Sequence, residues 1–274
     1  MQARVAVDGR ELGVDLSSPA DLALALDFAG PQPRHFGAPR AGSRPFEVPG
    51  FRGSVERGAS CNCELITLIP HCNGTHTECA GHLTRERLDA CRVAPFGLLP
   101  ALLLSVRPEP AAPAGESTLP PPQASDLLIT RRALERAIPP DAPFAPRALV
   151  IRTLPNTPDK RVRDYSAHTP PYLSLEAAQW LVSQGILHLV VDVPSIDRAH
   201  DEGRLTAHRT FFGLPAGSTQ LAAAMRAAAT VTELAFIPDT VPDGAYLLEL
   251  QVPALSGDAV PSRPLLYRLT GGSP

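Results

Sequence analysis

Proline is the residue that most constrains how this chain folds. The sequence holds 31 prolines and 20 glycines in 274 residues. Proline interrupts helices and is confined to the edges and ends of sheets. An all-helical bundle is therefore disfavoured, and many residues lie in loops and at strand ends. Because 44% of the residues are hydrophobic, a sizeable core is still expected, and no change in composition divides residues 1–274 into two domains.

Strands outnumber helices in the expected pattern. Ser174 is placed to cap the clearest helix, with Glu176 in its first turn and Gly185 at its end. The continuous apolar run 187–193 is typical of a buried parallel strand. These features indicate an α/β fold with a mixed sheet that is antiparallel in part. Further strands are expected at 63–69, 99–106, 148–153, 230–237, 246–252 and 265–269, helices at 131–138 and 221–229, and an irregular surface loop at about 30–60.

Charge and hydropathy exclude several classes of partner. The net charge is −3 with no block of like charge, so no nucleic-acid partner is expected. The longest apolar stretch, 94–106, is broken by prolines and too short to span a membrane. The first residues lack the apolar region of a secretory signal, and five cysteines are an odd number. We therefore expect a cytoplasmic protein with free or metal-bound thiols, and Cys61, Cys63 and Cys91 in the core.

One short segment carries most of the residues suited to chemistry. Residues 70–84 read PHCNGTHTECAGHLT, with three histidines, two cysteines and one glutamate within twelve positions. A single histidine or cysteine is more often structural, but these side chains together are the ligands of zinc and related ions. The spacing is not that of a structural zinc site. Motifs of zinc proteases, serine hydrolases, phosphate-binding loops and dinucleotide-binding folds are absent.

Weaker candidates lie outside this segment. Asp192 and Ser195, at the end of the run 187–193, border a possible substrate pocket or form a capped turn. His35 and Phe36 cover a substrate ring or serve only as packing anchors. His188 is expected to be a hydrogen-bonded core residue.

The motifs resemble those of the cyclase family of metal-dependent hydrolases, which includes kynurenine formamidases and isatin hydrolases. The family signature is His-x-Gly-Thr-His-x-Asp-x-Pro-x-His. Gly74-Thr75-His76 matches it, and His82 follows His76 by six residues as in the signature. Further similar stretches lie at 171–174, 191–197, 207–209 and around Glu233, so the resemblance covers roughly residues 12–270.

This resemblance implies a single domain of swivelling β/β/α architecture, acting on a small-molecule substrate and forming a homo-oligomer. It implies an arylformamidase-like amidohydrolase of an N-formyl or cyclic amide, as in tryptophan catabolism. One or two divalent ions, zinc first and manganese second, would activate water. His82 would be the catalytic proton shuttle. The implied metal ligands are Cys72, His76, Glu78, His208 and Glu233.

Three departures from the signature suggest a distinct subgroup. Glu78 replaces Asp, and Ala80 replaces Pro. Cys72 takes the first His position in an alignment without gaps, although a one-residue bulge would place His71 there instead. The substrate therefore need not be formylkynurenine. Two alternatives stay open, namely a non-enzymatic metal- or ligand-binding protein on the same scaffold, and a hydrolase or dehydratase of a lactone-like ring.

Overall fold

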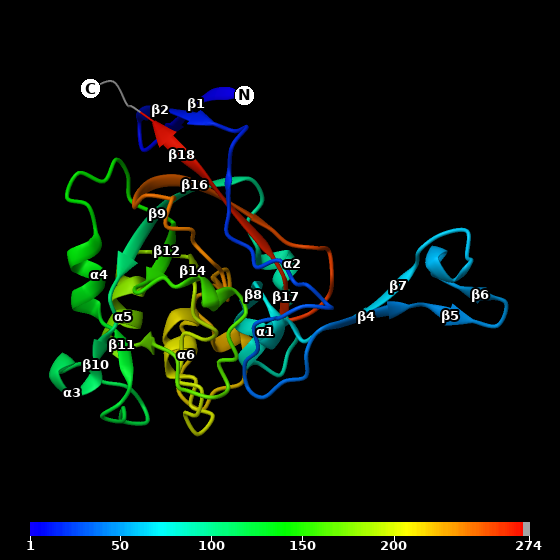
Figure 1. Ribbon diagram of the computed structural model, residues 1–274. Helices are drawn as coiled ribbons and strands as arrows, with labels where there is room; N and C mark the ends of the chain where they lie inside the picture. Colours follow the sequence, from blue (N-terminus) through cyan, green and yellow to red (C-terminus); the bar gives the residue numbers. More distant parts are fainter. Residues whose placement is uncertain (271–274) are drawn as a thin grey trace.

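A large mixed sheet runs through the molecule in the computed structural model, which describes residues 1–270 (Figure 1). Its centre is a block of parallel strands, and antiparallel strands extend it on both sides. This arrangement confirms the expected α/β fold with a mixed sheet. In sheet order the strands are β1 (Gln2–Val7), β2 (Arg10–Asp15), β18 (Arg263–Thr270), β16 (Gly244–Gln251), β9 (Leu98–Val106), β12 (Ala148–Thr153), β14 (His188–Val191), β15 (Thr230–Glu233), β8 (His76–Cys79) and β17 (Ala259–Pro261), and β3 (Ala20–Asp21) pairs with β18.

The parallel strands are buried on both faces, which explains why their sequences are continuous apolar runs. All six residues of β12 are buried. Side chains such as Leu149 and Ile151 pack in one core cluster with residues of the helices, while Val150 packs against Tyr246 and Ile237 on the other face. The helices of the first face are α4 (Arg131–Ala137), α5 (Leu175–Ser183) and α6 (Thr206–Phe212).

Local signals set where two of these helices begin. The Ser174 hydroxyl accepts a hydrogen bond from the Ala177 amide at 2.9 Å, as the sequence predicts for a cap. Thr130 caps α4 in the same way. The helix expected at 221–229 is wrong, because only Leu221–Ala223 forms a 3₁₀ turn. The amides of Met225 and Arg226 bond instead to carbonyl oxygens at the end of α6, and the alanine-rich stretch has little apolar surface to hold a helix in place.

Short elements complete the fold. A small sheet joins β10 (Glu109–Pro110), β11 (Leu127–Ile129) and β13 (Tyr172–Leu173). The short helices are α1 (Pro70–Asn73), α2 (Ala90–Val93) and α3 (Ala111–Ala114), and 3₁₀ turns lie at Val55–Arg57, Ala80–Leu83 and Pro158–Arg161. No helix within residues 1–270 combines the length and the apolar character that crossing a bilayer requires.

Residues 42–67 form an arm that projects from the body of the molecule (Figure 1). The arm pairs β4 (Gly42–Pro45) with β7 (Glu64–Thr67) and β5 (Glu47–Val48) with β6 (Phe51–Arg52). Part of the expected irregular loop is thus a ribbon of strands. The strand expected at 63–69 is β7, and it is exposed along its whole length. Cys61 and Cys63 are exposed on this arm rather than in the core, and Cys91 is half-buried.

A buried ion pair lies at the carboxyl ends of β12 and β14. Asp192 accepts hydrogen bonds from the amide and hydroxyl of Thr153, at 2.9 and 2.8 Å. Its other partner is Lys160, the only lysine of the chain, whose Nζ lies 2.9 Å away. Burial raises the pKa of the Asp192 carboxyl, which Lys160 opposes. The pair therefore ties the loop after β12 to the sheet.

Removing the carboxylate of Asp192 is expected to destabilise the fold strongly. Asp192→Ala leaves the Lys160 ammonium buried and unpaired, which costs about 3–5 kcal/mol in the free energy of unfolding. Denaturant unfolding monitored by circular dichroism measures the change. The control is Glu11→Ala, an exposed residue of strand β2, for which a change within about 0.5 kcal/mol is expected. A loss for Asp192→Ala as small as that of the control would contradict a structural role for the pair.

Candidate metal centre

Strand β8 brings two candidate ligands onto one face of the sheet. Side chains alternate along a strand, so His76 and Glu78 point the same way. Thr77 points to the other side, where its hydroxyl lies 2.7 Å from that of Thr232. His76 and Glu78 are both buried. The two-residue spacing therefore has the consequence that the sequence predicts.

The neighbouring strand β15 adds a second carboxylate. It pairs antiparallel with β8, and this register sets Glu233 directly opposite His76. Oε2 of Glu233 lies 3.4 Å from Nε2 of His76. Residues directly opposite each other on paired strands have neighbouring side chains. The hydrogen bonding of the two strands therefore brings together residues that are far apart in the sequence.

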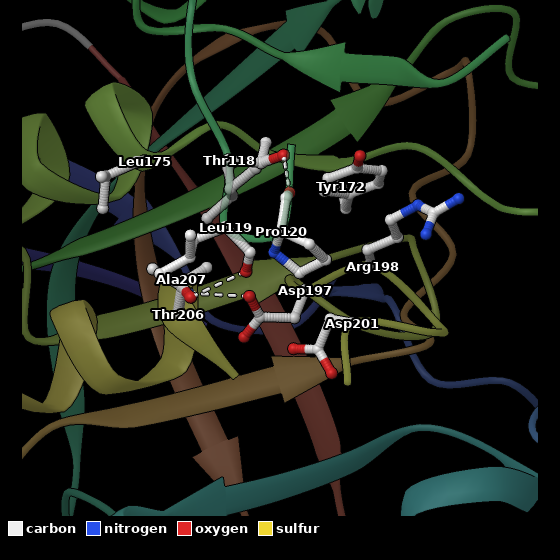
Figure 2. A pocket seen from close by; sticks show the side chains of 11 residues that line it. Thr118, Leu119, Pro120, Tyr172, Leu175, Asp197, Arg198, Asp201, Thr206 and Ala207 are labelled. Carbon is white, nitrogen blue, oxygen red and sulfur yellow. Dashed lines mark hydrogen bonds between the residues drawn. The ribbon is translucent and has the colours of Figure 1, made fainter. Parts of the chain in front are cut away.

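Helix α6 supplies His208 from the other side. Its Nε2 lies 2.7 Å from Oε1 of Glu78 and 3.4 Å from Oε1 of Glu233. Its Nδ1 donates to Oδ2 of Asp197 at 2.7 Å. The Asp197 carboxylate also accepts the amides of Ala207 and His208. Figure 2 shows Asp197 beside the start of this helix. One buried carboxylate thus holds both the helix and the ring.

The geometry leaves the coordinating atoms of this cluster free. The Nδ1–H of His76 donates to the Gly74 carbonyl at 2.9 Å, so its Nε2 carries the lone pair. Nε2 of His76, Nε2 of His208 and Oε1 of Glu78 are all buried, and within residues 1–270 none makes a hydrogen bond of good geometry, although Nε2 of His208 lies close to Oε1 of Glu78. Glu78, His208 and Glu233 each offer an atom within 4.8 Å of the others. Two imidazoles and two carboxylates fit a zinc or manganese ion.

His71, rather than Cys72, lies next to this cluster. Its Nδ1 is 3.1 Å from Oε2 of Glu78, and His71, His76 and Glu78 form a second group with ligand atoms within 4.8 Å. Cys72 belongs to no such group in the described chain. This placement departs from the expectation that Cys72 is the ligand. Residues 70–73 form a helical turn, α1, which rotates neighbouring side chains by about 100°, so His71 and Cys72 do not face Glu78 together.

Asp258 joins the site from the segment before β17, and no sequence motif points to it. Its Oδ2 lies 2.9 Å from Nε2 of His71 and 3.2 Å from Nδ1 of His82. The amide of Cys79 donates to its carbonyl, which places it at the end of β8. The residue before His82 is Gly81, where no side chain fits, because a Cβ at this position would lie 2.3 Å from the Leu88 carbonyl oxygen. Asp258 could have been recognised as a residue of the site only from the pairing of β17 with β8.

The site gathers more negative charge than a buried region tolerates without a cation. Burial opposes ionisation of Glu78, but His208 and His82 lower its pKa well below the usual range. Burial likewise opposes a charge on His208, yet Glu78 and Asp197 raise its pKa. The pKa of His71 rises to about 10 against burial, through its bonds to Asp258 and Glu78. Protons and a divalent ion therefore compete for the same lone pairs.

A cavity of about 720 Å³ opens beside these ligands. Phe36 and Ser195 line it, as the sequence analysis proposes for a substrate pocket, and His35, Cys72 and His82 do so as well. Asp192 does not line it; its carboxylate is committed to Lys160 and Thr153. His188 is a core residue bonded to Thr230, as expected.

Backbone strain gathers around the same cavity. Phe36, Glu202 and Leu205 line it and have φ values of 57°, 60° and 47°. Leu234, directly after Glu233, has a φ of 52°. Residues other than glycine adopt this region at a cost, and do so mainly at functional sites.

Comparisons with known proteins place the chain among similar sequences and folds. The sequence profile of the family described as "Putative cyclase" matches residues 14–198. A predicted metal-dependent hydrolase from Bacillus stearothermophilus has a similar structure, with a TM-score of 0.56, 17% identity, and coverage of 91% of this chain and 98% of its own. Isatin hydrolase A from Labrenzia aggregata is similar too, with a TM-score of 0.56, 16% identity, and coverage of 91% and 93%. No curated protein matches the sequence.

Loss of the Asp197 carboxylate charge is expected to weaken metal binding. Asp197→Asn keeps the shape but no longer orients His208 as strongly, and such partners of a ligand typically contribute about 10- to 100-fold in affinity. Competition with a chromophoric chelator measures the dissociation constant for zinc. The control is Asp201→Asn, a nearby buried carboxylate that bonds only to loop amides. Equal affinities for both variants would contradict the role of Asp197.

Metal binding is also expected to release protons and to strengthen as the pH rises. Contacts with Asp258 and Glu78 raise the pKa of His71 to about 10, and Glu78 and Asp197 raise the pKa of His208. An ion that binds at either ring is therefore expected to displace a proton at pH 7.5, and each proton released raises the apparent affinity by about tenfold per pH unit. Calorimetric zinc titrations in buffers of different ionisation enthalpy count these protons. At least about one per ion is expected, and fewer for His71→Gln. Zero release in the unmodified chain would contradict the assignment.

Proposed function

The chain belongs to the cyclase family, and on that basis we propose that it is a metal-dependent hydrolase that cleaves a small amide, with an arylformamidase-like preference. One observation carries the proposal. Buried ligand atoms of His76, Glu78, His208 and Glu233 lie in two overlapping groups that share Glu78 or are joined through Glu233, directly beside a cavity large enough for a small molecule.

The chemistry divides between the ion and the protein. A divalent ion held by His76, Glu78, His208 and Glu233 would polarise the amide carbonyl and lower the pKa of water towards about 7. His82 lines the cavity at the edge of this cluster, with its ring centre 5.8 Å from that of His208. It takes the proton of the attacking water and delivers it to the leaving nitrogen as the carbon–nitrogen bond breaks. The products are a carboxylic acid and an amine.

Asp258 positions the proton carrier. Its carboxylate accepts from Nδ1 of His82 at 3.2 Å, which leaves Nε2 as the nitrogen that exchanges the proton. The two histidines on Asp258 hold the pKa of this carboxyl well below its usual range, so it remains a charged acceptor. A rival role for His82 comes from the same geometry, because His71, His82 and Asp258 also form a group suited to a second ion.

The cavity favours a planar aromatic substrate. Phe36 and the imidazole of His200 meet edge to face at its wall, with ring centres 5.9 Å apart. Flat rings pack well in such surroundings. Two similar structures of isatin hydrolases hold benzyl benzoate and the product analogue thioisatinate, which supports aromatic compounds as the substrate class. Both nitrogen and oxygen ligands suit zinc, with manganese as the alternative.

A substrate panel tests the proposal. The purified chain, loaded with zinc or with manganese, is assayed against N-formyl arylamines, cyclic amides such as isatin, cyclic imides, and aryl lactones. Hydrolysis of the formyl arylamines with the highest kcat/KM is expected. Highest activity on lactones would show that the substrate is a cyclic ester rather than an amide. Tight metal binding with no turnover on any compound would indicate a non-enzymatic binding protein.

Replacing His82 is expected to separate proton transfer from metal binding. His82→Asn removes the shuttle, so kcat falls by about 10²–10⁴, while the metal content per chain by elemental analysis stays near that of the unmodified protein. The control is His76→Ala, which is expected to lose metal and activity together. Loss of metal from His82→Asn in proportion to its loss of activity would make His82 a ligand.

A further inference from the structure

Two more cavities continue from the metal centre along the surface. We call the cavity beside the ligands the metal cavity, and the next two, of about 400 and 630 Å³, the middle and distal cavities. The metal and middle cavities share residues 35–36 and 199–200 as lining. The middle and distal cavities share Tyr165, His168 and Thr169. The three therefore adjoin in a row.

The distal cavity lies where ligands bind in other sheets of this kind. Arg107 follows β9, Leu154 follows β12, and Asp192 follows β14, and all three line it. These strands are parallel neighbours, so the cavity sits at their carboxyl ends. In open α/β sheets this edge is the usual place for a binding crevice.

The distal cavity carries unbalanced positive charge. Both of its acidic residues are already paired, Asp192 with Lys160 and Asp164 with Arg34. Arg163 is paired with Asp159. Arg107 makes no side-chain hydrogen bond or ion pair with any other residue in 1–270, and it is exposed at the rim. Its guanidinium is thus available for a planar anion such as a carboxylate.

The junction between the metal and middle cavities contains an unsatisfied histidine. His35 is only 2% exposed, and neither of its ring nitrogens has a hydrogen-bond partner within the described chain. Leaving such groups buried and unpaired costs about 1–3 kcal/mol. A ligand atom that crosses the junction would supply the missing bond. Phe36, in a strained conformation with a φ of 57°, forms the adjacent wall.

We propose that the three cavities act as one groove for an elongated substrate. The amide lies at the metal centre, a linker crosses the junction at His35, and a terminal carboxylate binds Arg107 in the distal cavity. This inference rests on the proposed function for its reactive end only. It makes the preferred substrate an aromatic amide with an acidic tail rather than a compact formamide.

A series of formanilides tests the groove. The compounds carry at the para position an alkyl chain of increasing length that ends in a carboxylate, each matched by its methyl ester. In the unmodified protein KM is expected to fall once the chain is long enough to reach Arg107, for the acids and not for the esters. Arg107→Ala is expected to raise KM for these long acids by about two- to fivefold, within the range of partly exposed ion pairs, with kcat and the KM of formanilide unchanged.

The control variant is Arg268→Ala, an exposed arginine on β18, for which no change is expected. Calorimetric binding of the same compounds gives dissociation constants even if none is hydrolysed. Failure of the hydrolase proposal would therefore leave the groove testable.

Two results would overturn the groove. One is equal affinity for acids and esters at every chain length, and the other is an equal loss of affinity in Arg107→Ala and Arg268→Ala.

Discussion

The antiparallel pairing of β8 with β15 is the interaction on which the site depends. It sets Glu233 opposite His76 and leaves Glu78 two residues along on the same face. The same pairing joins β8 to the parallel block, because β15 pairs with β14, so three of the candidate ligands stand on hydrogen-bonded strands of the sheet. Function placed on strands rather than on loops keeps ligand positions to within a fraction of an ångström. The loops around it then need only shape the cavity.

Charge balance is the second constraint. Glu78 and Glu233 are both buried within a few ångströms of each other, and two buried carboxylates repel strongly unless a cation lies between them. His208 responds by holding a proton more tightly than usual. Two imidazoles and two carboxylates are a donor set compatible with a divalent ion, and under the proposed function that ion would take the place of the protons. Asp197 orients the His208 ring in either case, because it accepts a hydrogen bond from Nδ1.

The groove gives the strained loops a common purpose. Residues around Phe36 and 199–205 hold unfavourable backbone angles at the walls of the metal cavity, and the same loops border the middle cavity. Binding energy from a substrate that contacts several such walls is available to orient its reactive bond. An extended substrate would use these surfaces, whereas a compact one would leave most of them in contact with water.

Much of this protein follows from its sequence. The run 187–193 predicts a buried strand, Ser174 predicts its helix cap, and the spacing of His76 and Glu78 predicts a shared face, because each depends only on periodicity and local hydrogen bonds. Tertiary structure alone decided the rest. Asp258 enters the site only through the pairing of β17 with β8, and the helical turn of residues 70–73 sets His71, rather than Cys72, beside Glu78. Neither arrangement is visible in a linear pattern, since both depend on which distant segments meet.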